Sequence, residues 1–287
     1  MLNWRDPRNP QAGGAERVSQ RYLLALRERG HHVEWFVNQF PGGAPHETVE
    51  SLPVTRGGGR GSSILAAMEW YRAQPRFDLV IDQHHGIPWF APWWCGTNCV
   101  AYIHEVLGPI WDSFFNWPWN VIGREQEKLT HQLYAGVPFW TPSDSTRREL
   151  EARGVRSVKV LSNGVDTKPL PELPPKPLAA PLRLITVSRL APNKRVDHAV
   201  RLVAELKQRG HASELMIVGG GDCETDLRRL VAELGLVTVV RFSGRVTEAE
   251  KNRLLGEAHF LVHPSQREGW GLNVIEANAM GTPALVY

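Results

Sequence analysis

The sequence predicts an α/β protein built from two Rossmann-like domains, each with a parallel sheet. The second half alternates between short apolar runs, typical of buried strands, and amphipathic runs, typical of helices. Continuous apolar strands that alternate with helices indicate a parallel sheet covered on both faces. Six prolines fall within residues 169–181, and neither a helix nor a strand tolerates that density. We therefore interpret 169–181 as an extended linker between domains at 1–168 and 182–287.

The first half contains the same two kinds of segment. Leu2-Asn3-Trp4 is typical of the end of a strand, and an amphipathic helix is expected over 16–29, where Gly30 ends the run. Residues 42–61 are rich in glycine and proline and are expected to form mainly loops. The other expected strands are 33–37, 79–81, 100–103, 139–142 and 158–161, and the other helices are 64–72, 125–134 and one that is capped by Ser143 or Asp144 and runs to Arg153.

In the second half each expected strand but the last is followed by a helix. The strands are expected at 182–188, 215–218, 239–242, 260–264 and 284–287, and the helices at 196–208, 224–234, 248–257 and 272–280. Ligands of open α/β sheets bind at the carboxyl ends of the strands. Residues that directly follow a strand are therefore the first candidates for a functional site.

Composition narrows the class of function. The chain has 287 residues, of which 42% are hydrophobic and 22% charged, as in an ordinary soluble globular protein. Its net charge of +3 is too small to indicate a nucleic-acid partner. No apolar run is long enough to span a bilayer, and the first residues lack the apolar core of a signal peptide. Cys95, Cys99 and Cys223 have no zinc-site spacing and suit a reducing cytoplasm, where we expect the protein to reside.

The turn after the strand at 260–264 is the strongest candidate site. A strand, a glycine-bearing turn and a helix in that order form an anion site, because free amides and the helix dipole meet at the start of the helix. Gly269 and Gly271 let the backbone approach a ligand closely. Glu276, about one turn into the helix, could accept hydrogen bonds from a ribose diol, and Glu268 lies near any group beyond the phosphates. The same residues also fit an ordinary turn with two solvated glutamates.

Other candidates follow other strands. Arg189 and Lys194 bracket the turn after the strand at 182–188, where two cations could clamp a diphosphate and stabilise it as a leaving group, or could be surface charges. His104 follows the strand that ends at residue 103 and could equally be structural. Gly13-Gly14 could face a ligand or form a plain turn.

Six of the eleven tryptophans lie between residues 89 and 119, which is too dense for one core. Core packing explains most of these rings. We expect some of them to be exposed, either beside a sugar acceptor or on a surface that contacts the inner face of a membrane.

The segment Arg267-Glu268-Gly269-Trp270-Gly271-Leu272-Asn273-Val274-Ile275-Glu276 resembles the signature of glycosyltransferase family 4. Its two glutamates are separated by seven residues. Asn163-Gly164-Val165-Asp166 also matches the family, and the resemblance covers nearly the whole chain. It implies the GT-B fold, in which two Rossmann-like domains face across a cleft. The family continues beyond Tyr287, so we expect a fragment with an incomplete C-terminal domain and weak or absent turnover.

The resemblance also implies roles for individual residues. Arg189 and Lys194 would bind the donor diphosphate, His104 would contact the donor sugar near the reacting carbon, and the nucleobase would be read at Arg245 and Val246. Catalytic roles are implied for Glu268, His104, Arg189 and Lys194. Donor contacts are implied for Gly13, Gly14, Arg189, Lys194, Arg245, Val246, Glu268, Gly269, Trp270, Gly271, Leu272 and Glu276.

The resemblance implies retaining transfer of a sugar from a UDP-, GDP- or ADP-linked donor to a hydroxyl of a sugar or a lipid-linked acceptor. The setting would be cell-envelope glycan, glycolipid or exopolysaccharide synthesis. The sequence has no Asp-x-Asp triplet, so we expect neither a metal nor another cofactor. Two alternatives stay open: a GT-B sugar-nucleotide epimerase, and a nucleotide-sugar-binding remnant without turnover.

Overall fold

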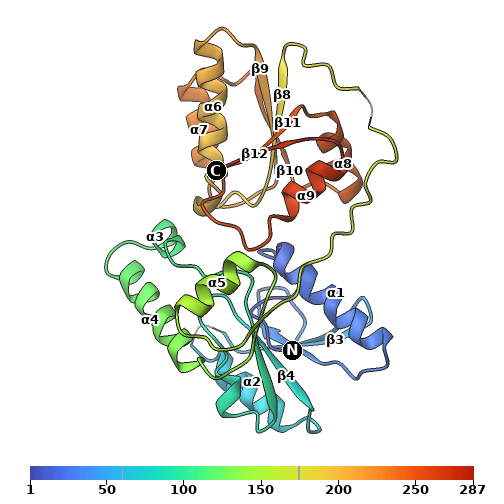
Figure 1. The fold of residues 1–287 in the computed structure, drawn as a ribbon, viewed down its shortest axis with the longest axis vertical. Coiled ribbons are helices and arrows are strands. Elements are labelled where there is room, and N and C mark those ends of the chain that lie inside the picture. The colour runs from blue at the N-terminus through green and yellow to red at the C-terminus, as the bar shows by residue number, and fades with distance from the viewer. Residues whose placement is uncertain (60, 174) are drawn as a thin grey trace. The chain divides into compact units, whose positions relative to one another are not determined.

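The computed structural model describes residues 1–59, 61–173 and 175–287. The chain forms two compact units, Met1–Gly164 and Val165–Tyr287, each with its own sheet and core (Figure 1). The described residues of the proline-rich stretch form neither strand nor helix and belong to the second unit. The Leu170 amide there donates to the carbonyl of Ala279.

The second unit contains a fully parallel sheet with the strand order β10-β9-β8-β11-β12. Its strands are β8 (Leu182–Val187), β9 (Ser213–Val218), β10 (Val240–Gly244), β11 (Phe260–His263) and β12 (Ala284–Val286). The order reverses between β8 and β11, which are neighbours in the sheet but not in the sequence. At such a switch point the loops after the two strands run to opposite faces of the sheet and leave room for a ligand.

Helices cover both faces of this sheet. Leu184 of β8 packs in a core with α6 (Val196–Gln208) and α7 (Glu224–Glu233), whereas Ile185 and Val187 pack with α8 (Glu248–Glu257) and α9 (Leu272–Ala279). Figure 1 shows α6 and α7 on one side of the sheet and α8 and α9 on the other. Burial on both faces explains the apolar runs in the inner strands β8, β9 and β11. The predicted α/β class is confirmed in this unit.

The sheet of the first unit is completed by one residue at its centre. Leu2 forms parallel bridges to Phe36 of β1 and Asp82 of β4 and so joins the strand groups β2-β3-β1 and β4-β5-β6-β7. The predicted strand end at Leu2 is therefore confirmed. The strands are β1 (Trp35–Asn38), β2 (His46–Val49), β3 (Leu52–Gly57), β4 (Leu79–Gln83), β5 (Asn98–Tyr102), β6 (Phe139–Thr141) and β7 (Val158–Val160).

The prediction of mainly loops over 42–61 is wrong for the hairpin β2–β3. The two strands pair antiparallel through a turn at Glu50 and Ser51, both of which have positive φ. Such a turn matches the twist of hairpin strands. Its usual sequence signal is glycine or asparagine at the central positions, and this turn has neither. Leu52 and Val54 are buried in a core with Leu23 of α1 (Gly14–Glu28), which fixes the register of the hairpin.

The helices of the first unit mostly follow the predicted pattern. The Ser143 side chain caps the helix that follows it, as predicted, by accepting a hydrogen bond from the amide of Thr146. One helix of this unit was not predicted, and another begins at Trp119 instead of residue 125. The helices are α1 (Gly14–Glu28), α2 (Ser63–Arg72), α3 (Ile110–Phe114), α4 (Trp119–Leu133) and α5 (Asp144–Ala152), with short 3-10 helices η1 (Ala91–Trp93) and, in the second unit, η2 (Pro192–Lys194).

Candidate functional site

Two loops meet at the switch point of the second unit, one after β8 and one after β11. The amide of Gln266 donates to the carbonyl of Asn193 at 2.9 Å, which ties the two loops together. The side-chain amide of Asn273 donates to the carbonyl of Val187 and fixes the first turn of α9 to the end of β8. The loops and the start of α9 therefore form one rigid edge at the carboxyl ends of β8 and β11.

Lys194 and Glu268 form an ion pair across this edge. Glu268 Oε1 lies 2.6 Å from Lys194 Nζ and 3.1 Å from His263 Nε2. Burial on its own would raise the pKa of Glu268, but the close contact with His263 and the charge of Lys194 outweigh it and lower the pKa to about 2. Glu268 is therefore a carboxylate at physiological pH. The Lys194 ammonium has three N–H donors, so its bond to Glu268 leaves donors for an anion.

His263 is a site residue that the sequence analysis missed. It is buried and is the last residue of β11, where its side chain points to Glu268. In the sequence it lies inside a run interpreted only as a buried strand. A histidine at the carboxyl end of a strand that leads into the site was the available signal.

The remaining cation, Arg189, lies in the loop after β8, and its side chain is exposed. The backbone beneath it is fixed by the glycine turn after β9. A Cβ added to Gly219 would lie 1.9 Å from the carbonyl oxygen of Ser188, and one added to Gly221 would lie 2.5 Å from that of Leu190. These glycines thus allow two strand-end loops to pack backbone against backbone.

The turn before α9 has the geometry of a helix start. Gly271 is the N-cap residue and has φ of 73°, a left-handed conformation that favours glycine. Gly269 is buried, whereas Trp270 and Leu272 are partly exposed beside it. Glu276 follows one turn later on α9, and its Oε2 lies 2.8 Å from Nζ of Lys251 on α8. Arg245 and Val246 directly follow β10 at the same edge of the sheet.

In the first unit, the predicted residues come after Leu2 and after β5. Gly13 is the N-cap of α1, and its amide donates to the Glu16 carboxylate at 2.7 Å, so this amide already has a partner. Gly14 is the first residue of α1. His104 comes two residues after the end of β5.

A chain of polar side chains links His104 to α1. Gln83 Nε2 lies 2.9 Å from His104 Nε2, and Gln83 Oε1 lies 2.6 Å from Ser19 Oγ on α1. Burial lowers the pKa of His104 to about 4, so the ring is neutral at pH 7. Because the Gln83 amide donates to Nε2, the ring proton is on Nδ1. Sequence analysis identified neither Gln83 nor Ser19, because only the fold brings them to His104.

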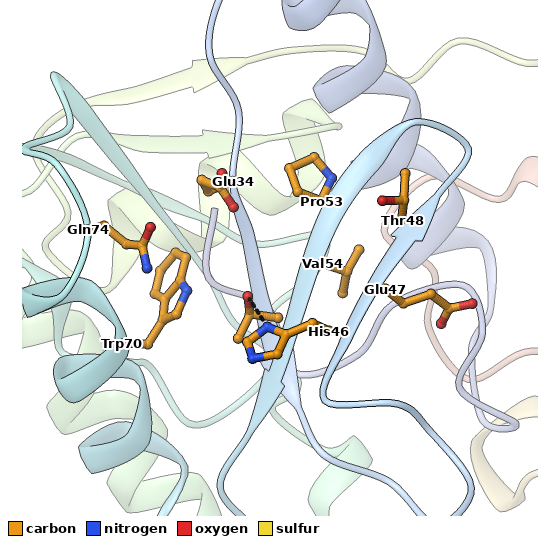
Figure 2. A pocket seen from close by; sticks show the side chains of 9 residues that line it. Glu34, His46, Glu47, Thr48, Pro53, Val54, Trp70 and Gln74 are labelled. Atoms are coloured by element: carbon orange, nitrogen blue, oxygen red, sulfur yellow. Dashed lines mark hydrogen bonds between the residues drawn. The ribbon is translucent and has the colours of Figure 1, made fainter.

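A hollow elsewhere in the first unit does not contain the predicted residues. Its volume is about 490 Å³, and Figure 2 shows it between the strands of the β2–β3 hairpin and the residues Trp70 of α2 and Gln74, which follows that helix. Among the residues that the structure describes, its lining includes the carboxylates Glu34 and Glu47 and contains no lysine or arginine. A diphosphate needs cationic partners, so this hollow does not suit the donor.

The expected exposure of aromatic rings is confirmed. Trp117 is 80% and Trp119 65% exposed, and Phe114 and Phe115 beside them are about half exposed. Trp89, by contrast, is fully buried. No helix in the described parts of the chain has the length and apolar character needed to cross a membrane. Among residues 1–59, 61–173 and 175–287, no three histidine, cysteine, aspartate or glutamate side chains cluster as metal ligands would.

Comparison with known proteins gives matches over both units. A model of the glycosyl transferases group 1 matches residues 175–287, and a model of Glycosyltransferase Family 4 matches residues 12–169, more than half of the chain. A glycogen synthase of Mycobacterium tuberculosis is 31% identical over 135 residues, which are 47% of this chain and 33% of that protein. The amylovoran biosynthesis glycosyltransferase AmsK of Erwinia amylovora is 33% identical over 38% of this chain and 28% of that protein. The chain thus spans about a third of the length of these curated relatives.

Solved structures resemble the fold over nearly the whole chain. Sucrose-phosphate synthase from Thermosynechococcus elongatus has a TM-score of 0.74 at 20% identity, covering 96% of this chain and 76% of that one. HepE of Anabaena in complex with UDP and glucose has a TM-score of 0.70 at 18% identity, covering 99% and 79%. These likenesses confirm the predicted fold, with two Rossmann-like units of the GT-B type.

Proposed function

Because this chain belongs to Glycosyltransferase Family 4, we propose that it transfers a sugar from a nucleotide-sugar donor to an acceptor hydroxyl, with retention of configuration at the sugar carbon. The observation that carries the proposal is the Lys194–Glu268 ion pair at the switch point of the second unit. It places a fixed cation beside the first turn of α9, where a ligand of an open α/β sheet binds.

The second unit supplies the groups that a leaving diphosphate needs. Lys194, Arg189 and the amides near Gly271 and Leu272 would stabilise the negative charge that develops on the diphosphate when the sugar departs. The ion pair with Glu268 restrains the Lys194 side chain before the donor arrives, which reduces the entropy lost on binding. The predicted donor contacts at Gly269, Trp270, Arg245 and Val246 follow the same strand ends.

Two charged groups would complete the donor site. Glu276 would accept hydrogen bonds from the ribose, and Glu268, ionised at physiological pH, would position the sugar. In the first unit, His104 would donate a hydrogen bond from Nδ1 to the donor sugar as a neutral ring, not as an acid. The Gly13-Gly14 turn would contact the diphosphate or the acceptor. A phosphate oxygen of the leaving group would take the acceptor's proton, so no side chain is needed as a base.

We propose that the transfer needs no metal ion, because Arg189 and Lys194 supply the positive charge that a metal would otherwise bring to the diphosphate. Transfer should therefore continue in excess EDTA. Loss of activity in EDTA that magnesium or manganese restores would contradict this part of the proposal.

The relatives suggest where to begin with substrates. The HepE structure contains UDP and glucose, so UDP-sugars come first, followed by GDP- and ADP-sugars. AmsK is named for amylovoran biosynthesis. We propose that the acceptor belongs to cell-envelope glycan, glycolipid or exopolysaccharide synthesis. Nucleotide release that depends on an acceptor would support transfer over epimerisation. Donor binding without any turnover would favour a binding protein.

The decisive variant is Lys194→Met, with Lys207→Met on the exposed end of α6 as the matched control. Loss of one preorganised group that stabilises the leaving group should lower kcat about a hundredfold or more. Lys207→Met should leave kcat within about twofold of the unaltered chain. Equal turnover by both variants, or no binding of any UDP-, GDP- or ADP-sugar, would contradict the proposal.

We also propose that the protein works in the cytoplasm, at the inner face of a membrane, with a lipid-linked acceptor. Support comes from Trp117 and Trp119, whose amphipathic rings suit the bilayer interface. Co-sedimentation with liposomes of zwitterionic and anionic lipids should fall when both are changed to Ala. Trp93→Ala, at another exposed tryptophan, is the control. Absence of liposome binding by the unaltered chain would exclude the membrane contact.

A further inference from the structure

Lys251 is a nearly buried cation held between two carboxylates of different helices. It is 8% exposed, and its Nζ lies 2.7 Å from Glu248 Oε2 and 2.8 Å from Glu276 Oε2. Glu248 and Lys251 are one turn apart on α8, whereas Glu276 is on α9. Burying a lysine costs free energy through lost hydration, so its position requires strong partners.

The contact with Glu276 is not needed to hold the two helices together. Leu255 and Ala258 of the α8 segment already share an apolar core with Ala277 and Met280 of the α9 segment. A lysine one turn after Glu248 could also satisfy its charge with that residue alone, in solvent. The Lys251 side chain instead reaches Glu276 on α9 and brings a buried positive charge to a carboxylate beside the candidate donor site.

The pair constrains how Glu276 can bind a ligand. Lys251 Nζ forms an ion pair with Oε2 of Glu276, and no described residue donates a hydrogen bond to the other oxygen, Oε1. A carboxylate held at one oxygen cannot rotate freely, so its second oxygen keeps one direction. The side chain of Glu276 is only 12% exposed, which further limits its rotamers.

We propose that Lys251 is a positioning residue for the ribose of the nucleotide: it holds Glu276 Oε2 so that Oε1 is fixed to accept a hydrogen bond from a ribose hydroxyl. The inference rests on the proposed function, which assigns Glu276 to the ribose. It adds that recognition of the ribose hydroxyls depends on a residue of another helix that does not itself touch the nucleotide. Lys251 also offsets the negative charge of Glu276, which would otherwise repel the diphosphate.

The test compares a ribonucleotide with its deoxy counterparts. Calorimetry with the full chain would use whichever of UDP, GDP or ADP binds most tightly, and its 2′-deoxy and 3′-deoxy forms. The unaltered chain should prefer the ribonucleotide about tenfold to a hundredfold, because one charge-assisted hydrogen bond is lost with the hydroxyl. Glu276→Gln should abolish most of this preference and thereby locate it at Glu276.

Lys251→Met should reduce the preference for the ribonucleotide over its deoxy forms to about threefold or less, mainly by weakening the binding of the ribonucleotide. Glu248→Gln is the matched control, since it removes the other carboxylate and leaves the Lys251–Glu276 pair intact, and it should retain the preference. Lys251→Arg keeps a cation within reach of Glu276 and should retain part of it. If Lys251→Met fails to fold, Lys251→Gln, which keeps a donor without the charge, gives the same comparison.

The outcomes separate the two proposals. If Lys251→Met weakens the binding of the ribonucleotide and of its deoxy forms equally, the variant has lost only stability or charge. This result would overturn the positioning role of Lys251, while the proposed function would stand. The same holds if Glu276→Gln abolishes the preference and Lys251→Met does not. If the unaltered chain binds no nucleotide, the proposed function fails and the inference fails with it.

Discussion

At the scale of single residues, the candidate site is defined by pairs that restrain one another. Lys194 and Glu268 follow different strands, and the sequence predicts each as a separate donor contact. In the fold they bind each other, and His263 joins them from the end of β11. The pairing explains why a partly buried carboxylate stays ionised there. Charge in this site is therefore arranged before any ligand enters, which is what stabilisation of a leaving group requires.

Buried histidines give the first unit a pH dependence of known sign. Burial first, and then the charges of Arg153 and His84, lower the pKa of His131 to about 3, below its ordinary value of 6.5. The folded state therefore binds fewer protons than the unfolded state between these values. Stability that is fully present above pH 6.5 is lost as the pH falls toward 3.

We expect about 1 kcal/mol of unfolding free energy to be lost through His131 between pH 7.5 and 5.5, a range above most carboxylate titrations. His104, whose pKa is also lowered, acts in the same direction. Urea unfolding of His131→Asn at both pH values should show a smaller difference than the unaltered chain. His31→Asn, at an exposed position, is the control. An unchanged difference in the His131 variant would show that His131 does not cause the effect.

Gly219 is the residue whose replacement should most damage the second unit. Its φ of 127° is unfavourable for any side chain, and a Cβ there would overlap the Ser188 carbonyl at 1.9 Å. We expect Gly219→Ala to lower the unfolding free energy by about 3 kcal/mol or more. Gly256→Ala in α8, where a Cβ meets nothing within 4 Å, should be neutral or stabilising by up to about 1 kcal/mol. Equal denaturation midpoints for the two variants would refute this account.

At the scale of elements, strands buried on both faces could be predicted and hairpin strands could not. The run at 182–188 matches β8 at Leu182–Val187, because its continuous apolar pattern reflects cores on both sides of the sheet. The β2–β3 hairpin depends on positive φ at Glu50 and Ser51, which those residue types do not announce. The start of α4 was missed because Trp119 and Ile122 are exposed and break the apolar periodicity expected of a packed helix.

The same contrast holds for the site. Residues that follow strands, such as Arg189 and Lys194, could be located from sequence because parallel strands place their carboxyl ends at one edge. His263, Lys251 and Gln83 lie inside strands or helices. His263 is 5 residues from its partner Glu268, Gln83 is 21 residues from His104, and Lys251 is 25 residues from Glu276. The fold brings each pair of side chains together. Sequence patterns do not show which of these side chains meet, although the place of His263 at the end of a strand was a signal that it faces the site.

A buried ion pair should decide the stability of the loop before α1. Asp6, between Leu2 and the Gly13 turn, accepts hydrogen bonds from Arg56 Nε at 2.7 Å and Nη2 at 3.1 Å, and both side chains are buried. Asp6→Asn removes the fully buried one of the two carboxylates that pair with the guanidinium. We expect a loss of about 3–5 kcal/mol of unfolding free energy in the first unit.

The control for Asp6→Asn is Glu205→Gln, at an exposed pair with Arg209 on α6, which should change stability by less than about 1 kcal/mol. The unfolding free energy of the Asp6 variant is measured by chemical denaturation followed by tryptophan fluorescence. That of the control is measured by denaturation followed by far-UV circular dichroism. A change below about 1 kcal/mol for Asp6→Asn would mean that Glu47, which also contacts Arg56 at 2.8 Å, compensates the charge alone.

At the scale of the whole molecule, the two units carry different spectroscopic probes. Ten of the eleven tryptophans belong to Met1–Gly164, and Trp270 alone belongs to Val165–Tyr287. Each unit has its own apolar cores. Tryptophan fluorescence therefore reports mainly on the first unit, whereas hydrogen exchange of amides in β8 and β11 reports on the second.

Lys176 permits a test of whether the units unfold separately. It lies in the proline-rich stretch, and its Nζ donates to Thr282 Oγ1 at 2.6 Å and to the Gly281 carbonyl at 3.1 Å, with the carbonyls of Ala258 and Met280 at 3.3 Å. Lys176→Met leaves these partly buried acceptors without their donor. We expect the second unit to lose about 1–3 kcal/mol, seen as faster exchange in β8 and β11.

In Lys176→Met, the urea midpoint of the first unit, followed by tryptophan fluorescence, should stay unchanged. The hydrogen bonds of Lys176 described above all lie within the second unit. Lys168→Met, at an exposed lysine directly before this stretch, should change neither probe. A fluorescence midpoint that falls together with the exchange protection of β8 and β11 would show that the units unfold as one cooperative structure. Equal exchange in both lysine variants would instead show that the hydrogen bonds of Lys176 do not stabilise the second unit.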